Sequence, residues 1–216
     1  MSQSKQLLRM SFLVFLLLIV SIILFFLTKT SWFNQYDVVI LRKLVVFRTS
    51  AGLSFFKWLS YIGSAHVLPF VLVGFTIILL IIKKPKVMVI WLACFLLQKY
   101  INSLIKNSVQ RPRPILHHYE LATGYSFPSG HAMNAITVYG LLALILVLLI
   151  KSRLLRILVL FIGFLIVILI GLSRLVLDVH YLSDVIAGYC IGGILVSISM
   201  YLIISKELIQ TNTNKE

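Results

Sequence analysis

Six apolar stretches dominate the sequence, and such stretches cross a lipid bilayer as α-helices of about 20 residues. The expected spans are 10–28, 62–82, 87–105, 132–150, 157–172 and 185–204. Of the 216 residues, 60% are hydrophobic and only 12% are charged, which is unlike a soluble globular domain. We therefore predict an all-α, polytopic membrane protein, with six transmembrane helices in one bundle over residues 1–205 and a polar tail at 206–216.

The charge distribution favours a membrane partner over nucleic acid. The formal net charge is +14, from 20 Lys and Arg against 6 Asp and Glu, but the basic residues lie in connections between apolar runs. The short connections 83–86 (KKPK) and 151–156 (KSRLLR) are the most basic, and they lie on the same side as the N-terminus. The positive-inside rule makes that side cytoplasmic, and an even number of spans places both termini there. The other connections are then expected on the outer face.

The first outer connection, residues 29–61, is amphipathic and rich in aromatic side chains. This pattern is typical of helices that lie in the membrane interface. We therefore expect an interfacial helical segment between spans 1 and 2, on the same face as three polar clusters at 106–114, 125–131 and 173–184.

Three cations in these clusters are expected near membrane level: Lys106, Arg113 and Arg174. Burying cations together is costly unless an anion joins them, and arginine offers paired donors that suit phosphate oxygens. Pro112 and Pro114 end the preceding helix, so that Arg113 can turn back toward Lys106. Ordinary interfacial anchoring explains Lys106 or Arg174 alone, but it is a weaker explanation for all three together.

The second cluster, YSFPSGH (125–131), opens the fourth expected span. Ser129 is a natural N-cap, Gly130 allows close approach to the backbone, and His131 stands beside a helix start whose free N–H groups attract anions. A phosphate cradle with an acid next to it fits these residues. On these residues alone, a plain helix cap is the better explanation.

The third cluster contains a histidine and an aspartate four residues apart, His180 and Asp184. One helical turn lets the two side chains face each other. A carboxylate on one imidazole nitrogen leaves the other nitrogen free to attack an electrophile. A structural His–Asp pair is the alternative. Two other acids, Glu120 and Asp178, are expected to pair with neighbouring arginines.

Together the clusters contain a nucleophile with its orienting acid, a second histidine and a group of cations. Phosphoryl transfer relies mainly on positioning and charge stabilisation, which these groups supply. We predict no metal and no cofactor, because acids are few and no His-x-His or Asp-x-Asp pair occurs.

These residues resemble the three-part signature of the type-2 phosphatidic acid phosphatase superfamily. The matching motifs are Lys106-x6-Arg113-Pro114, then Pro128-Ser129-Gly130-His131, then Ser173-Arg174-x5-His180-x3-Asp184. The resemblance implies that His180 attacks phosphorus and forms a phosphohistidine, that Asp184 holds His180, and that His131 protonates the leaving oxygen. It implies phosphoryl-oxygen contacts from the remaining site residues: Lys106, Arg113, Ser129, Gly130 and Arg174.

The size and layout are similar to those of bacterial membrane lipid phosphatases. The resemblance implies a lipid phosphate substrate in the bacterial plasma membrane: phosphatidylglycerophosphate, undecaprenyl diphosphate or phosphatidate. It also implies a site on the outer face, where segment 29–61 would form a wall or lid. The sequence does not choose among these lipids, and it does not predict an oligomeric state.

Two alternatives to a phosphatase stay open: a transporter or flippase that binds an anionic headgroup without hydrolysis, and a scaffold that has lost activity. The role of Lys99 is also open. It lies seven residues before Lys106 on roughly one helix face, where it could extend the polar pocket, but extension toward the membrane surface or an internal hydrogen bond is the favoured interpretation. Asn102, one turn from Lys106, is a plausible supporting partner.

Overall fold

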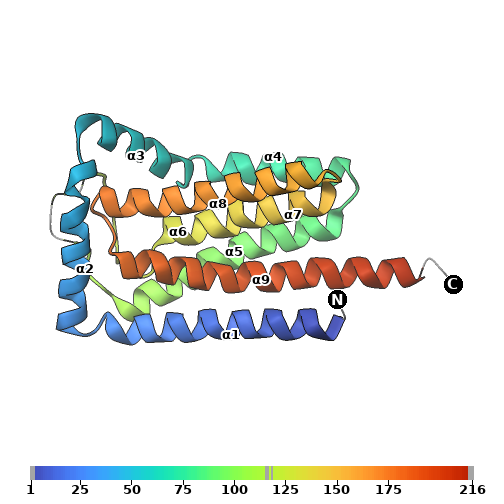
Figure 1. Ribbon diagram of the computed structural model, residues 1–216, viewed down its shortest axis with the longest axis horizontal. Coiled ribbons are helices and arrows are strands. Elements are labelled where there is room, and N and C mark those ends of the chain that lie inside the picture. The colour runs from blue at the N-terminus through green and yellow to red at the C-terminus, as the bar shows by residue number, and fades with distance from the viewer. Residues whose placement is uncertain (1–2, 115–116, 118, 214–216) are drawn as a thin grey trace.

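The computed structural model describes residues 3–114, 117 and 119–213, and all regular secondary structure within those residues is helical (Figure 1). The elements are α1 (Gln3–Leu27), α2 (Ser31–Lys43), η1 (Leu44–Phe47), α3 (Ser50–Ile62), α4 (Leu68–Ile81), α5 (Pro85–Val109), α6 (Gly130–Asn134), η2 (Ala135–Gly140), α7 (Leu141–Leu149), α8 (Arg153–Val176) and α9 (Leu182–Thr213).

Five helical stretches are long and apolar enough to cross a membrane: 7–27, 85–109, 130–149, 153–176 and 182–205. They correspond to predicted spans 1, 3, 4, 5 and 6, so the chain is a multi-pass integral membrane protein. The third stretch is one continuous helix made of α6, the π-helical η2 and α7.

The predicted second span, 62–82, is interrupted. Helix α3 ends at Ile62 and α4 begins only at Leu68, so the apolar helix there is shorter than expected. Pro69 has no backbone N–H to donate to the carbonyl of Ala65, as a continuous helix would require, and Gly63 ends α3, which together explain the break. At the other end of the chain, α9 runs on to Thr213, inside the predicted polar tail, while 214–216 lie outside the described residues.

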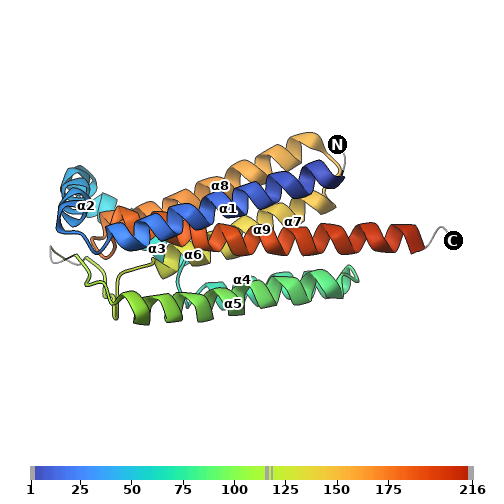
Figure 2. The ribbon, with the colours of Figure 1, turned by 90° about the horizontal axis from the view of Figure 1, so that it is seen from below.

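The long helices run side by side along the longest axis of the molecule, and both chain termini lie at the same end (Figure 1). Helix α2 lies across the opposite end of the bundle, nearly at right angles to it, and α3 leads back toward α4. Figure 2 shows α4 and α5 together on one side of the bundle, with α8 and α1 on the other. The predicted 29–61 segment is therefore helical and caps one end.

Helix α9 packs at the centre of the bundle through small residues. A Cβ atom at Gly188 would lie 2.7 Å from the backbone oxygen of Ser129, and one at Gly192 would lie 2.3 Å from a methyl carbon of Ile136. Small residues are typical of such close helix contacts in membranes. This contact holds α9 against the start of α6, close to the candidate site.

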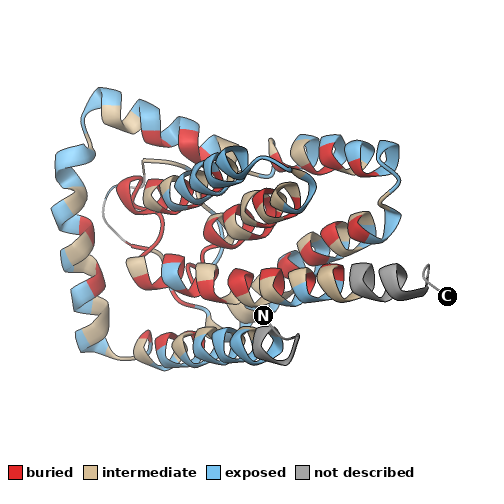
Figure 3. Ribbon diagram, turned by 45° about the vertical axis from the view of Figure 1, so that its right-hand side comes forward, coloured by how far each residue is buried: buried red, intermediate tan, exposed pale blue. Residues whose placement is uncertain are grey.

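The outer faces of the bundle are apolar and exposed, while buried residues face inward (Figure 3). Phe12, Phe70 and Phe161 are 66%, 79% and 60% exposed. In a soluble protein such surfaces mark an interaction site, and in a multi-pass membrane protein they are the surface that meets lipid.

A buried ion pair anchors the capping segment to the bundle. Arg48, which follows η1, lies 3.2 Å from Asp178 and donates from Nε to the carbonyl of Val176 at 3.0 Å. The predicted pairing of Asp178 with an arginine is thus confirmed. Because Asp178 lies between α8 and α9, this contact fixes the loop that carries His180.

The close contact at Gly188 gives a prediction for stability. Gly188→Val should push α9 away from α6 and cost about 1–3 kcal/mol, because a packed interface has no room for the added atoms. Thermal melting of the purified protein in detergent measures the effect. The matched control is Gly74→Val in α4, where an added Cβ meets nothing within 4 Å. Equal melting temperatures for the two variants would contradict the packing described.

Candidate active site

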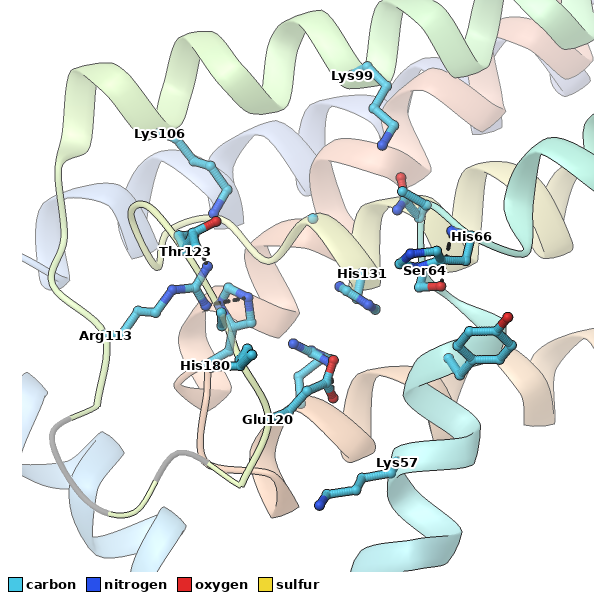
Figure 4. Close-up of a pocket in the computed structure, with 17 residues that line it drawn as sticks. Lys57, Ser64, His66, Lys99, Lys106, Arg113, Glu120, Thr123, His131 and His180 are labelled. Atoms are coloured by element: carbon cyan, nitrogen blue, oxygen red, sulfur yellow. Dashed lines mark hydrogen bonds and ion pairs between the residues drawn. The ribbon is translucent and has the colours of Figure 1, made fainter.

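A cavity of about 710 Å³ lies among α3, α5, the 110–129 connection, α6 and the loop between α8 and α9 (Figure 4). Six of the eight predicted site residues line it: Lys106, Arg113, Gly130, His131, Arg174 and His180. They come from all three sequence clusters. The structure thus brings together residues that are up to 74 positions apart in the sequence.

The other two predicted residues do not line this cavity. Asp184 is fully buried behind His180, in the first turn of α9. Ser129 is also fully buried, and its hydroxyl accepts a hydrogen bond from the backbone N–H of Ala132. The predicted N-cap role of Ser129 is therefore confirmed, whereas its predicted contact with phosphate stays a prediction.

The imidazole of His180 has two distinct sides. Nδ1 lies 3.5 Å from Oδ2 of Asp184 and 3.3 Å from Oγ of Ser126. Nε2 lies 3.2 Å from Nη1 of Arg113. The carboxylate favours a proton on Nδ1, which leaves the lone pair of Nε2 on the side of Arg113, a residue that lines the cavity.

Burial lowers the pKa of His180 to about 3, against the raising effect of its contact with Asp184; Arg113 and Arg174 lower it further. The imidazole is therefore neutral at physiological pH. A neutral imidazole with a free lone pair is the form that acts as a nucleophile.

Asp184 is held by groups from three parts of the chain. Its carboxylate accepts hydrogen bonds from Ser126 Oγ, from the backbone N–H of Tyr181 at 2.9 Å, and from Nη1 of Arg111 at 2.6 Å. A buried charge needs such partners to offset its desolvation. The acid that orients His180 is therefore itself fixed in place.

Arg111 links Asp184 to helix α2. Its Nη2 donates to Asp37 at 2.8 Å and to Asn34 at 2.6 Å, and its guanidinium lies 4.1 Å from the ring centre of Tyr181. Arg111 and Asp37 are both almost fully buried. The sequence analysis did not identify Arg111, Asp37 or Ser126 as site residues. The position of Arg111, beside Pro112 in a basic cluster, was a signal that could have pointed to it.

Arg113 is oriented by backbone carbonyls. Its guanidinium donates to the carbonyls of Gly124 at 3.0 Å, Thr123 at 2.8 Å and Val179 at 2.7 Å. Burial, and then the nearby charge of Arg174, lowers the pKa of Arg113. Carbonyl groups carry no full negative charge, so an anion in the cavity would relieve the repulsion between Arg113 and Arg174.

Arg174 is almost fully buried and carries a carboxylate partner. Its Nη1 donates to Oε2 of Glu120 at 2.9 Å and to the hydroxyl of Ser60, whereas its Nε has no hydrogen-bond partner among the described residues. The predicted pairing of Glu120 with an arginine is confirmed. Glu120 occupies one donor of a residue that was predicted to bind phosphate.

Two more groups complete the polar lining. The buried Nε2 of His131 has no hydrogen-bond partner within the described part of the chain. Lys106 donates to the carbonyl of Tyr125. Asn102 donates to the carbonyl of Pro128 at 3.3 Å, which ties α5 to the start of α6. This supports the predicted role of Asn102 as a neighbour that positions the site.

Metal ligands do not gather in this region. Within 3–114, 117 and 119–213, no group of three or more His, Cys, Asp and Glu side chains is placed to hold an ion. The two free cysteines, Cys94 and Cys190, are buried in the bundle, as their apolar sequence surroundings predict.

The comparisons with known proteins identify a protein family and a shared fold. The family model of the PAP2 superfamily matches residues 87–207. Phosphatidylglycerophosphatase B of Bacillus subtilis (strain 168) is 35% identical over 99 residues, which are 45% of this chain and 48% of that protein. The match therefore spans about half the length of this curated relative.

Two solved structures share the fold. The crystal structure of the first transmembrane PAP2-type phosphatidylglycerolphosphate phosphatase from Bacillus subtilis aligns with a TM-score of 0.82 at 25% identity, over 89% of this chain and 96% of that chain. Aquifex aeolicus LpxE aligns with a TM-score of 0.60 at 25% identity, over 76% of this chain and 94% of that chain.

The environment of His180 predicts its titration. Because burial holds its pKa near 3, the imidazole should stay neutral throughout pH 5–8 in the free protein. NMR of protein labelled with ¹³C at histidine Cε1, with the His180 signal assigned through His180→Gln, checks this. A chemical-shift midpoint near 6.5 for that signal would contradict the buried geometry.

The Arg111 network predicts a large effect on stability. Arg111→Met should destabilise the protein by about 3–5 kcal/mol, because it leaves two buried carboxylates without their cation. Thermal melting provides the measurement, with Arg42→Met, an exposed arginine of α2, as the control. If both variants melt like the parent protein, Arg111 does not hold Asp184 as described.

Proposed function

Because the chain belongs to the PAP2 superfamily, we propose that it is a lipid phosphate phosphatase that hydrolyses a phosphomonoester or diphosphate of a membrane lipid. Phosphatidylglycerophosphate, undecaprenyl diphosphate and phosphatidate are the candidate substrates. The observation that carries the proposal is the cavity in which two histidines and three cations from separate motifs meet. A single tetrahedral phosphate group would contact all of them.

In the first step, Nε2 of His180 attacks phosphorus. A bond forms between nitrogen and phosphorus while the bond between phosphorus and the lipid oxygen breaks. His131, which would carry a proton once the anionic phosphate is bound beside it, gives that proton to the departing oxygen, so that the lipid leaves as a neutral alcohol, or as a protonated phosphate from a diphosphate. Asp184, held by Arg111, stabilises the positive charge that His180 gains.

Lys106, Arg113 and Arg174 bind the non-bridging phosphoryl oxygens, on which negative charge concentrates. The phosphate would replace the carboxylate of Glu120 on Nη1 of Arg174. It would also replace the contact between Arg113 and Nε2 of His180, which frees that lone pair for attack. Gly130 and the hydroxyl of Ser129 complete the predicted set of phosphate contacts.

In the second step, water attacks the phosphohistidine. His131, now neutral, takes a proton from the water, the bond between phosphorus and nitrogen breaks, and inorganic phosphate leaves. His180 and His131 return to their starting protonation states. Every proton in the cycle is accounted for by these two histidines and water, without a metal or a cofactor.

We further propose six membrane spans, with α4 as the short second span, and an interfacial α2–α3 segment. The candidate site would lie on the outer face of a bacterial plasma membrane, and the termini would be cytoplasmic. The support is geometric, because the cavity is lined by residues of α3, α6 and the loop between α8 and α9, and these elements lie toward the capped end of the bundle, away from the termini (Figure 1). Trp32 and Trp58 are exposed in this capping segment, as is typical of the membrane interface.

The test is phosphate release by the purified protein in detergent from short-chain forms of the candidate lipids. His180→Ala should lower turnover at least about a thousandfold, because it removes the attacking atom. A chelator should leave the parent rate unchanged. His117→Ala is the matched control, since this side chain is exposed and only its backbone N–H bonds to Asp178.

Headgroup binding without phosphate release would favour the transporter alternative. Release that persists in His180→Ala would refute the phosphohistidine route. Release abolished by the chelator would point to a mechanism that these residues do not carry out by themselves.

A further inference from the structure

We propose that Lys99 forms a second anion subsite in the cavity, which binds a phosphodiester of the lipid headgroup while the first subsite binds the phosphate that is removed. This inference rests on the proposed phosphatase function and narrows its substrate class. The juxtaposition that carries it is Lys99 and Lys106 on one face of α5, both lining the same cavity (Figure 4).

The charge of the cavity exceeds what one phosphate needs. Five cationic side chains line it: Lys57, Lys99, Lys106, Arg113 and Arg174. Glu120 is the one carboxylate in this lining, and it is already paired with Arg174. A phosphomonoester carries a charge of at most about −2 near neutral pH. A ligand with one further negative charge would balance the cavity better.

Lys57 and Lys99 are the two lining cations that the first subsite does not use, and of these Lys99 lies in the same helix as Lys106. Seven residues separate it from Lys106, which places the two on nearly one face of α5 and about 10 Å apart along the helix axis. Within the described part of the chain, Lys99 has no carboxylate partner; its recorded contact is the ring of Phe95, 5.5 Å from ring centre to Nζ. A cation inside an apolar span is costly unless an anion or water meets it.

The position of Lys99 relative to Lys106 indicates where the second anion would bind. Helix α5 begins near the end of the bundle that holds the termini, so Lys99 lies deeper in the bundle than Lys106 (Figure 1). A lipid whose terminal phosphate reaches His180 would have its acyl chains on the deeper side. The second anion must therefore lie between the reacting phosphate and the acyl chains.

This geometry separates the candidate lipids by chemistry. Phosphatidate has a single phosphate, so nothing anionic would reach Lys99. In a diphosphate, the two phosphorus atoms share one oxygen, so both stay near Lys106 and Arg113. A lipid whose terminal phosphate is joined through a polyol to a phosphodiester spaces the two anions apart in the required order. Of the three candidates, phosphatidylglycerophosphate has this arrangement.

Asn134 supports the same class of ligand. It lines the cavity one turn after His131, and its Nδ2 donates to the carbonyl of Gly63 at 3.3 Å. Its buried Oδ1 has no hydrogen-bond partner among the residues that the structure describes. A hydroxyl group on the bridging polyol would donate to this oxygen and satisfy it.

The test compares the parent protein with Lys99→Met on dioctanoyl phosphatidylglycerophosphate, dioctanoyl phosphatidate and farnesyl diphosphate. The ratio of kcat/KM for phosphatidylglycerophosphate to that for each other substrate should fall about tenfold or more, mainly through KM, because one charge-assisted contact is lost. Lys99→Arg should restore most of the ratio. The matched control is Lys86→Met, an exposed lysine at the far end of the same helix.

An unchanged ratio in Lys99→Met, or an equal loss on all three substrates, would overturn the subsite. Thermal melting of each variant separates misfolding from lost binding, and the substrate ratio is independent of the active fraction. Failure of the proposed function looks different, because the parent protein would then release no phosphate from any of the three lipids.

Discussion

The ion pair between Arg111 and Asp184 is the interaction on which the rest of the site depends. Asp184 is fully buried, and its carboxylate faces His180 on one side and Arg111 on the other. Without Arg111, a buried carboxylate would be driven toward its protonated form, and a neutral acid would not favour the Nδ1–H tautomer of His180. Through Asp37, the same arginine fixes α2 across the end of the bundle. One buried network thus holds both helix α2 and the carboxylate that orients His180.

The cavity holds several cationic side chains close together, although they repel one another. Arg113 is held by carbonyl groups, and Arg174 is only partly neutralised by Glu120, whose side chain is 30% exposed. Folding energy from the surrounding bundle therefore holds like charges together. In the proposed function, the entry of a phosphate would relieve the repulsion between these cations, most of all when charge accumulates on the phosphoryl oxygens. The fold thus holds its cations in fixed positions before any anionic group binds.

Much of the fold and of the candidate site could be predicted from the sequence, because the length of an apolar run and the spacing of a motif are local properties. Five apolar runs became long helices, Ser129 became an N-cap, and His180 faces Asp184, although it lies in the loop before α9 and not on a helical turn. The partners of Asp184 could not be predicted, since Asp37 is 147 positions away and is joined to it through Arg111. The orientation of Lys99 could not be predicted either. Whether its side chain faces a polar cavity depends on how the neighbouring helices pack around α5.

The break between α3 and α4 shows why the second apolar run departs from its prediction. A continuous helix over 62–82 would have satisfied its backbone internally, whereas the turn at 63–67 leaves polar groups that need other partners. The structure places this turn where it meets the cavity: Gly63 accepts from Asn134, and Ser64 and His66 line the polar wall. Irregular backbone at this depth is tolerated because it borders a polar cavity and not lipid. The shortened α4 therefore accompanies a turn that borders the polar cavity.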